Sequence, residues 1–355
     1  MTAVPIRVLI VDDSAIVRKL LSDALRGEPD IEVVGTAVDP YAARDMILRL
    51  SPDVITLDIE MPRMDGLSFL RRLMAHRPMP VIVISSLTQR GSAASIDALQ
   101  CGAIDVIPKP GGPYSVDQVT TRLKERLRGI RGLSSSRLAS RPLVSPTVPV
   151  TFAHTPRRNT LILIGASTGG PQAIESILTR LPAEAPPIVI VQHMPALFTR
   201  SFADRLNGLG PLTVSEAIDG ELLEPGHAYV APGDYHLLVV PRGLRLETRL
   251  STGVPVHRQR PAVDVLFHSA ARLKGTTIVA ALLTGMGQDG ADGMLALRDA
   301  GAETIAEDER SCVVFGMPRE AIMLGAARHV VTLADMPARL AHCVQQRAHE
   351  PATPS

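Results

Sequence analysis

The chain has few cysteines, almost no net charge and no long hydrophobic run. Its 355 residues include only three cysteines, Cys101, Cys312 and Cys343, which are odd in number and far apart. They match no metal-ligand spacing and predict reduced, structural thiols of the kind found in cytosolic proteins. The formal net charge of +1 argues against nucleic acid as a partner.

No run of apolar residues approaches the roughly 20 needed to span a membrane. The first apolar run of the chain, IRVLIV at 6–11, is too short for a signal peptide and is followed by two aspartates. We therefore expect a cytoplasmic protein without direct membrane insertion. Apolar residues make up 45% of the chain, which is ample for buried cores, and the length predicts two domains.

The first domain is expected over residues 1–127, where short apolar runs alternate with amphipathic segments. The runs that predict buried parallel strands are 6–11, 31–37, 54–57, 81–85 and 103–107. Asp39-Pro40 predicts a helix start, with Ala42, Met46 and Leu50 at helical spacing after it. This alternation is typical of a parallel α/β sheet with helices on both faces.

A linker and a second α/β domain follow. Residues 128–159 are rich in Ser, Pro and Arg without sustained periodicity, which predicts a flexible linker. From 160 to 348 the alternation of apolar runs and amphipathic segments resumes. Within it, the runs at 227–233 and 236–240 predict an inserted pair of β-strands.

Polar side chains occur at the ends of the first domain's predicted strands. They are Asp12, Asp13, Asp58, Ser85, Ser86 and Lys109. Ligands of open α/β sheets bind beyond the carboxyl ends of the strands. Three carboxylates there can hold Mg²⁺, and one of them can accept a phosphoryl group while a lysine neutralises charge.

The segments LIVDDS, VITLDIEMPRMDG, VISS and VIPKP resemble the receiver domains of two-component response regulators. The resemblance implies a flavodoxin-like fold with a five-stranded parallel sheet, and a histidine kinase as phosphodonor. It makes Asp58 the phosphoacceptor, and Asp12, Asp13 and Asp58 the Mg²⁺ ligands. Lys109 becomes the phosphate-binding lysine, and Ser85 or Ser86 the switch hydroxyl, with Ser85 favoured.

The glycine-rich stretch GASTGG, residues 165–170, opens three interpretations. A P-loop requires Lys and then Ser or Thr after the last glycine, but Pro171 and Gln172 follow. A dinucleotide site requires another glycine spacing and an acid after the second strand, where this chain has Gln192-His193. The remaining pattern, G-x-S-x-G, exposes a serine hydroxyl on a tight turn.

Two further residues favour the serine interpretation. A serine becomes nucleophilic only when a base takes its proton, and a third group must orient that base. His193 directly follows the apolar run 188–192, and Asp289 lies in the loop LLTGMGQDG after another predicted strand. Ser167, His193 and Asp289 are thus predicted to converge at one sheet edge as a catalytic triad. The chain order Ser, His, Asp differs from that of α/β-hydrolases.

Six segments resemble the chemotaxis protein-glutamate methylesterases of the CheB family: IGASTGG, QHMP, APGDYH, RPAVDVLFHSAA, LTGMGQDGADGM and SCVVFGMPREAI. The resemblance implies a doubly wound, mainly parallel catalytic domain, with the triad above and no cofactor for the esterase. It makes the backbone N–H of Met286 part of the oxyanion hole. The implied activity is phosphorylation-activated demethylation of glutamate methyl esters, and deamidation of glutamines, on chemoreceptor cytoplasmic helices.

Further polar and charged residues are candidates for supporting roles. Arg258 and Arg260 are candidates for pairing with acids of the receptor, and Thr168 for assisting the oxyanion site. His227, His236, His257 and His268 have no identifiable partner and are expected to be structural or exposed. The order of domains suggests that the unphosphorylated receiver covers the Ser167 cleft.

The sequence also bears on three other functions. A phosphorylation-controlled interaction module without catalysis is disfavoured because all three triad positions are filled. A DNA-binding regulator is disfavoured by the neutral charge and by the lack of a helix-turn-helix segment at the carboxyl end. A receiver-gated esterase for small molecules remains open.

Overall fold

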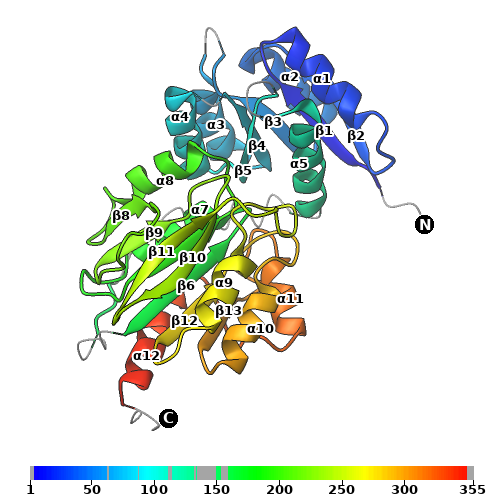
Figure 1. Ribbon diagram of the computed structural model, residues 1–355. Coiled ribbons are helices and arrows are strands. Elements are labelled where there is room, and N and C mark those ends of the chain that lie inside the picture. The colour runs from blue at the N-terminus through cyan, green and yellow to red at the C-terminus, as the bar shows by residue number, and fades with distance from the viewer. Residues whose placement is uncertain are drawn as a thin grey trace. The chain divides into compact units, whose positions relative to one another are not determined.

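The computed structural model describes residues 4–61, 64–86, 88–110, 114–131, 133, 149–152 and 159–349. The chain divides into two compact units, Met1–Leu143 and Val144–Ser355. Each unit has its own sheet and its own buried core (Figure 1). Most of the predicted linker, 128–159, lies outside the described residues, so the extent of the linker stays a prediction.

The sheet of the first unit is parallel throughout. Its strands are β1 (Ile6–Val11), β2 (Ile31–Ala37), β3 (Val54–Asp58), β4 (Val81–Ser85) and β5 (Asp105–Pro108). They pair in the order β2-β1-β3-β4-β5, which confirms the predicted five-stranded parallel sheet. All residues of β3 and β4 are buried, as expected for strands covered on both faces.

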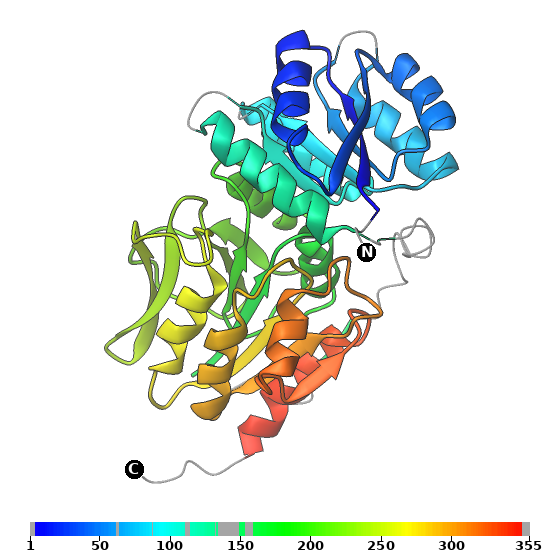
Figure 2. The same ribbon diagram turned by 90° about the vertical axis from the view of Figure 1, so that its right-hand side faces the viewer.

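Five helices cover this sheet: α1 (Ala15–Leu25), α2 (Pro40–Leu50), α3 (Gly66–His76), α4 (Gln89–Gln100) and α5 (Val116–Gly129). Asp39 caps α2 as predicted, since its side chain accepts a hydrogen bond from the N–H of Ala42. The helix buries Pro40, Ala43 and Ile47, while Ala42, Met46 and Leu50, whose spacing predicted the helix, are half-buried. Figure 2 shows helices on both sides of the sheet.

The second unit is built on a seven-stranded sheet. Its strands are β6 (Thr160–Ala166), β7 (Ile188–Gln192), β8 (Thr213–Glu216), β9 (His227–Val230), β12 (Thr277–Leu282), β13 (Glu303–Glu307) and β14 (His329–Val331). They pair in parallel in the order β14-β13-β12-β6-β7-β9-β8.

The two segments predicted to form an inserted β pair do not pair with each other. Segment 227–230 joins the main sheet as β9, between β7 and β8. The second segment forms β10 (His236–Arg242), which pairs antiparallel with β11 (Arg245–Ser251). The true neighbours, β8 and β11, are rich in polar residues and were not predicted as strands, which explains the error.

Helices cover both faces of the seven-stranded sheet: α7 (Gly170–Leu178), α8 (Phe198–Leu206), α9 (Val263–Ala271), α10 (Ala291–Asp299), α11 (Met317–Met323) and α12 (Met336–His349). Helix α9 packs against α10 and the hairpin β10–β11, and α10 packs against α11. Helix α7 packs against α8 and α12. This is the predicted doubly wound arrangement.

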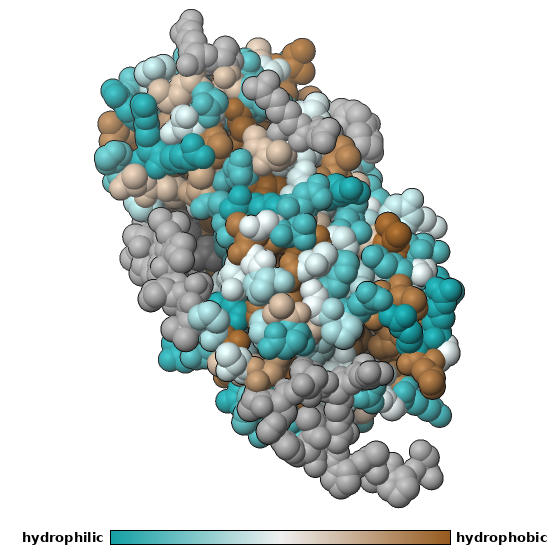
Figure 3. Space-filling model, turned by 90° about the vertical axis from the view of Figure 1, so that its left-hand side faces the viewer, coloured by the Kyte–Doolittle hydropathy of each residue, from teal (hydrophilic) through white to brown (hydrophobic). Residues whose placement is uncertain are grey.

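Large apolar side chains lie mainly in the two cores. On the face shown in Figure 3, hydrophobic residues occur in small groups among hydrophilic ones. No helix in the described part of the chain combines the length and apolar character needed to cross a membrane.

Candidate active site

Ser167 lies in the tight turn between β6 and α7, where close packing requires both flanking glycines. A Cβ added at Gly165 would lie 2.3 Å from Cγ1 of Val263. Gly169 has a φ of 80°, and a Cβ there would lie 2.3 Å from Cγ2 of Val313. The G-x-S-x-G pattern therefore places Ser167, which is 1% exposed, at the carboxyl end of β6.

The side chains of His193 and Asp289 meet at the same end of the sheet. Nε2 of His193 lies 2.7 Å from Oδ2 of Asp289, and both side chains are 2% exposed. His193 follows β7, and Asp289 lies in the loop after β12. Because β7 and β12 flank β6, their carboxyl ends bring these residues to the edge where Ser167 lies.

The carboxylate of Asp289 is held by the start of helix α9. Its Oδ2 also accepts a hydrogen bond from the N–H of Val263 at 2.7 Å, and its Oδ1 accepts one from Asp264 N–H at 3.0 Å. Burial opposes ionisation of Asp289, but the His193 contact and the two N–H groups outweigh it, so its pKa is lowered. A helix N-terminus thus keeps the acid ionised beside the imidazole.

Ser167 and His193 are adjacent across β6 and β7. Their neighbours connect them, since His193 N–H donates to the Ala166 carbonyl at 3.1 Å and Gln192 Nε2 donates to the Ser167 carbonyl at 2.9 Å. Oγ of Ser167 and Nδ1 of His193 are buried, and neither has a hydrogen-bond partner among the described residues. Catalytic hydrogen bonds of this kind are often long before a substrate binds.

The loop after β12 approaches Ser167 through Gly285. A Cβ added at Gly285 would lie 2.8 Å from Cβ of Ser167 and 2.2 Å from Sδ of Met317. The next residue, Met286, is half-buried, and its N–H donates no hydrogen bond to any residue that the structure describes. An unused N–H near the nucleophile suits an oxyanion donor, a role that stays a prediction for Met286.

Thr284 fixes the main chain around the nucleophile, a role that sequence reasoning missed. Its carbonyl accepts a hydrogen bond from Ser167 N–H at 3.0 Å, and its Oγ1 donates to the Thr168 carbonyl at 2.9 Å. The same hydroxyl accepts hydrogen bonds from the N–H groups of Val313 and Val314 at 3.1 and 3.0 Å. Thr168 itself is buried, and its predicted part in the oxyanion site remains untested.

A second histidine–carboxylate pair adjoins the first and was also missed. Nε2 of His257 lies 2.9 Å from Oδ2 of Asp264, whose Oδ1 accepts the Gly293 N–H at 2.7 Å. Burial, and then the charge of Asp289, raise the pKa of Asp264. The signal in the sequence is the seven-residue separation of the pair, but the contact also requires His257 to adopt a φ of 49°.

Arg258 and Arg260 lie in the loop before α9. Arg258 is exposed and has a φ of 63°. Nη1 of Arg260 donates to the carbonyls of Thr252 and Gly253 at 3.1 and 3.0 Å, so this side chain braces its own loop. Contact of either arginine with a receptor stays a prediction.

The first unit gathers its three acids at the carboxyl edge of its sheet. Asp12 and Asp58 are 1% and 0% exposed, and Asp13 is exposed. One oxygen from each of the three lies within 4.8 Å of the others. A donor set made only of carboxylate oxygens suits a hard cation such as Mg²⁺.

Lys109 reaches this cluster. Its Nζ lies 2.7 Å from Oδ2 of Asp58 and 3.5 Å from Oδ2 of Asp12. Burial, and then the charge of Asp58, raise the pKa of Asp12 to about 6. Burial also raises the pKa of Asp58, although Lys109 opposes this. One ammonium thus faces more negative charge than it can neutralise, which favours binding of a further cation.

The two candidate switch hydroxyls have different partners. Oγ of Ser85, which is fully buried, donates to the Gly91 carbonyl at 3.3 Å. Oγ of Ser86 donates to Oε2 of Glu60 at 2.6 Å. Glu60 N–H in turn donates to Oδ1 of Asp58 at 3.1 Å. Both hydroxyls lie near the acid cluster, and the preference for Ser85 stays a prediction.

Comparison with known families gives two matches along the chain. The CheB methylesterase family model matches residues 162–340. The response regulator receiver domain model matches residues 8–121. The first match contains the Ser167 site and the second contains the acid cluster.

Relatives match over nearly the full length. The chain is 51% identical to protein-glutamate methylesterase/protein-glutamine glutaminase 1 of Cupriavidus metallidurans, over 96% of each chain. It is 49% identical to a protein-glutamate methylesterase/protein-glutamine glutaminase 2 of Pseudomonas aeruginosa, over 95% of this chain and 96% of that protein.

A solved structure matches the second unit. The crystal structure of the Thermotoga maritima CheB methylesterase catalytic domain is 42% identical, with a TM-score of 0.50, and the match covers 51% of this chain and 97% of that one. Given this structure, the full-length relatives and the two domain matches, the chain belongs to the CheB methylesterase family and carries a response regulator receiver domain ahead of the methylesterase domain.

Proposed function

We propose that the second unit is a serine hydrolase that removes methyl groups from glutamate methyl esters on chemoreceptors, under control of phosphorylation in the first unit. One observation carries the proposal. His193 Nε2 is paired with Asp289 at 2.7 Å, while its other ring nitrogen and the Ser167 hydroxyl are buried without partners in the described chain. The names of the full-length relatives supply the substrate class.

The contact with Asp289 fixes the protonation of the imidazole. An ionised carboxylate is only an acceptor, so Nε2 of His193 carries the proton and Nδ1 presents a lone pair. Nδ1 takes the proton of Ser167 Oγ as that oxygen attacks the γ-carbonyl carbon of the ester. The resulting imidazolium is stabilised by the Asp289 carboxylate.

The tetrahedral intermediate then expels methanol. The Met286 N–H donates a hydrogen bond to the oxyanion, with Thr168 as a further candidate donor. Nδ1 of His193 returns its proton to the methoxy oxygen, and the C–O bond breaks to leave an acyl-Ser167 ester. Water, deprotonated by the same nitrogen, hydrolyses that ester and releases the glutamate carboxylate. A glutamine side chain follows the same steps and releases ammonia.

The acid cluster of the first unit receives the regulatory phosphoryl group. A carboxylate oxygen of Asp58 attacks the phosphorus of a phosphohistidine on the kinase, and the P–N bond to the imidazole breaks. Lys109 pairs with the new phosphoryl oxygens, and Ser85 or Ser86 donates a hydrogen bond to one of them. Asp12, Asp13 and Asp58 are the residues that would hold Mg²⁺, which supplies positive charge to the transferring phosphoryl group.

The nucleophile is tested with Ser167→Ala. We expect methanol release from methyl-labelled receptor membranes to fall by a factor on the order of 10⁶, because a triad without its nucleophile cannot form the acyl-enzyme. Ser176→Ala, in the middle of α7, is the matched control and should keep wild-type turnover. Methanol release by Ser167→Ala at a rate near that of the control would refute the assignment.

The substrate class is tested separately. Replacing receptor membranes by small carboxylic methyl esters distinguishes a receptor enzyme from a general esterase. We expect turnover with receptor membranes and little with the small esters. The opposite preference would favour the small-molecule esterase that the sequence left open.

A further inference from the structure

Three potential metal ligands meet at the opposite edge of the seven-stranded sheet. Glu303 is the first residue of β13 and His329 is the first residue of β14. Because these strands are parallel to β6 and β7, their first residues lie at the edge away from Ser167. Cys343, on α12, completes the group. The proposed hydrolase mechanism uses none of the three.

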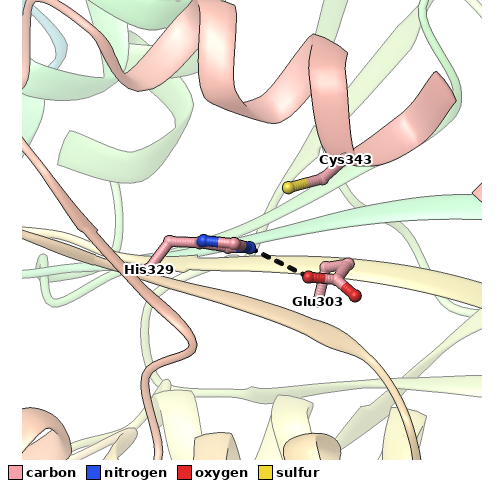
Figure 4. Close-up of side chains that lie close together, drawn as sticks. All are labelled: Glu303, His329 and Cys343. Carbon is pink, nitrogen blue, oxygen red and sulfur yellow. Dashed lines mark hydrogen bonds and ion pairs between the residues drawn. The ribbon is translucent and has the colours of Figure 1, made fainter. Parts of the chain in front are cut away.

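Their side chains lie on one face of the sheet and point toward one another. Nε2 of His329 lies 3.0 Å from Oε2 of Glu303, and Figure 4 shows the Cys343 sulfur pointing from α12 toward this pair. One ligand atom from each residue lies within 4.8 Å of the others. Register explains the arrangement, since His329 pairs with Ile305, two residues beyond Glu303, and alternate residues share a face.

Burial places the sulfur inside and the other two ligands toward solvent. Cys343 is 0% exposed, whereas the side chains of Glu303 and His329 are 13% and 28% exposed. An ion can therefore enter from the side of the imidazole and carboxylate. The same opening gives water access to a fourth coordination position.

The donor set suits zinc. Thiolate sulfur, imidazole nitrogen and carboxylate oxygen bind Zn²⁺ at about 2.3, 2.0 and 2.1 Å, so neighbouring ligand atoms of a tetrahedron are about 3.3–3.6 Å apart. The separations here, none above 4.8 Å, need only small side-chain movements to reach that geometry. One thiolate and one carboxylate also neutralise the charge of the ion.

The other two candidate clusters differ from this one. Asp12, Asp13 and Asp58 offer only oxygen, which favours Mg²⁺ over zinc. His257, Asp264 and Asp289 are also close together, but Asp289 is engaged with His193 and the start of α9. Only the cluster at Glu303, among those found in the described residues, contains sulfur.

We propose that Glu303, His329 and Cys343 form a zinc site that ties the last helix of the second unit to the edge of its sheet. On binding, the Cys343 thiol releases its proton to solvent and a Zn–S bond forms. His329 loses its Nε2 proton to solvent and takes one up on Nδ1, so that the Nε2 lone pair coordinates the ion in place of the hydrogen bond to Glu303. Glu303 contributes one carboxylate oxygen. Water fills the fourth position.

The location gives the ion a structural use. β14 has only three residues and lies at the edge of the sheet, where it pairs with β13 alone. Helix α12 is the last helix described. A metal bridging β13, β14 and α12 therefore adds a link among these three elements, because it binds only when all three are in place.

Cobalt distinguishes this site from the acid cluster. The full chain is titrated with Co²⁺ in excess Mg²⁺, which keeps the carboxylates of the first unit occupied. We expect one equivalent to produce a thiolate-to-cobalt charge-transfer band together with intense visible bands of tetrahedral Co²⁺, both bleached by Zn²⁺. Cys343→Ser should lose the charge-transfer band and Cys101→Ser should keep it. Absence of the band, or its survival in Cys343→Ser, overturns the proposal.

The second test measures the Zn²⁺ affinity and the Tm of variants at the two partly exposed ligands, His329 and Glu303. Chelator competition on the full chain should show that His329→Asn and Glu303→Gln each weaken Zn²⁺ binding by more than about 100-fold, beyond the usual effect of losing a group that only supports a ligand. Zn²⁺ should raise the Tm of the wild type but not of these variants. Equal Zn²⁺ affinity in wild type and variants contradicts the site. Esterase turnover with and without Zn²⁺ reports separately on the Ser167 mechanism.

Discussion

Three donors surround the carboxylate of Asp289, and two of them are main-chain N–H groups. Val263 and Asp264 N–H lie at 2.7 and 3.0 Å, and His193 Nε2 at 2.7 Å. An ionised carboxylate accepts all three hydrogen bonds, whereas an amide offers one oxygen and turns its NH₂ toward a donor. The site is thus built for an anion and not merely for a polar side chain.

Asp289→Asn should therefore reduce turnover far more than substrate binding. The asparagine NH₂ would donate to Nε2 of His193, which moves the ring proton to Nδ1 and removes the base that faces Ser167. We expect kcat to fall by a factor on the order of 10⁴, as in other serine hydrolases whose triad aspartate becomes asparagine, with KM little changed. Steady-state methanol release measures both constants. A variant with unchanged kcat would show that Asp289 does not orient the base.

The convergence of Ser167, His193 and Asp289 at one sheet edge could be predicted at this scale, because each residue directly or closely follows an apolar run that forms a buried strand. The contact between His257 and Asp264 could not, because it depends on a left-handed backbone at His257. The same limit applies to Glu303, His329 and Cys343, which follow no ligand spacing and meet only through strand register and helix packing.

The loop after β12 packs directly against Ser167. Gly285 leaves no room for a Cβ, which would lie 2.2 Å from Sδ of Met317 and 2.8 Å from Cβ of Ser167. Side-chain sulfur can move, but the Ser167 turn is fixed by its hydrogen bond to the Thr284 carbonyl. The loop must therefore shift if Gly285 is replaced.

Gly285→Ala should reduce turnover strongly while most of the fold remains, since the shift displaces the Met286 N–H from the oxyanion. Loss of one oxyanion donor costs about 10²–10³ in kcat. Gly208→Ala is the matched control, because its added Cβ would meet only the Arg205 carbonyl oxygen, at 3.6 Å. Turnover is measured beside the Tm of each variant. Equal turnover in both variants would argue against an oxyanion role for this loop.

Helix α5 is attached to the β1–β2 side of its unit by ion pairs at its carboxyl end. Arg128 donates through Nε and Nη2 to the two carboxylate oxygens of Asp30, both at 2.9 Å. These hydrogen bonds lower the pKa of Asp30 to about 2, although burial acts in the opposite direction. The pair is partly exposed, so it contributes less than about 1 kcal/mol.

The coupling between Asp30 and Arg128 should depend on pH in a defined direction. A lowered pKa means that the stabilisation is present above the unfolded value of about 3.9 and is lost as pH falls from there toward the folded value. A double-mutant cycle with Asp30→Asn and Arg128→Gln, followed by urea unfolding, should give a smaller coupling energy at about pH 3 than at about pH 7. The highly exposed pair Arg44–Asp45 serves as control. A coupling energy that grows on acidification would contradict the assignment.

Strongly apolar strands were easier to predict than strands rich in polar residues, such as β8 and β11. Apolar runs located β1 to β5 closely, and all residues of β3 and β4 are buried, whereas β2, at the edge of its sheet, is only partly buried. Strand β9 was paired wrongly because its neighbour β8, the short and largely polar segment Thr213–Glu216, was not predicted as a strand. The spacing of Ala42, Met46 and Leu50 predicted helix α2, but only packing shows that Ala43 and Ile47 are more fully buried than these three.

At the scale of the whole molecule, two sheets with separate chemistry are joined in one chain. The acid cluster and the Ser167 site each lie at the carboxyl edge of their own sheet. If the acid cluster controls the Ser167 site, a change at Asp58 must alter turnover at Ser167. Phosphorylation adds about two negative charges to the acid cluster, so the difference in turnover with and without a phosphodonor measures this control.

Deleting residues 1–143 should raise methanol release above that of the unphosphorylated full chain if the first unit covers the Ser167 cleft. Asp58→Asn in the full chain should stay at the low rate when a phosphodonor is added. Asp45→Asn, an exposed acid on α2, should respond to the phosphodonor like the wild type. A truncated chain no faster than the unphosphorylated full chain would exclude covering as the means of control.

The separation of the two sheets also has a consequence for protein engineering. In the described chain, no strand of one sheet pairs with a strand of the other. A gene fusion that replaces the sequence before residue 149 therefore removes no strand of the seven-stranded sheet. Sensors of light, metal ions or small ligands could be spliced ahead of the hydrolase, and the chimeras would still inherit a complete esterase scaffold.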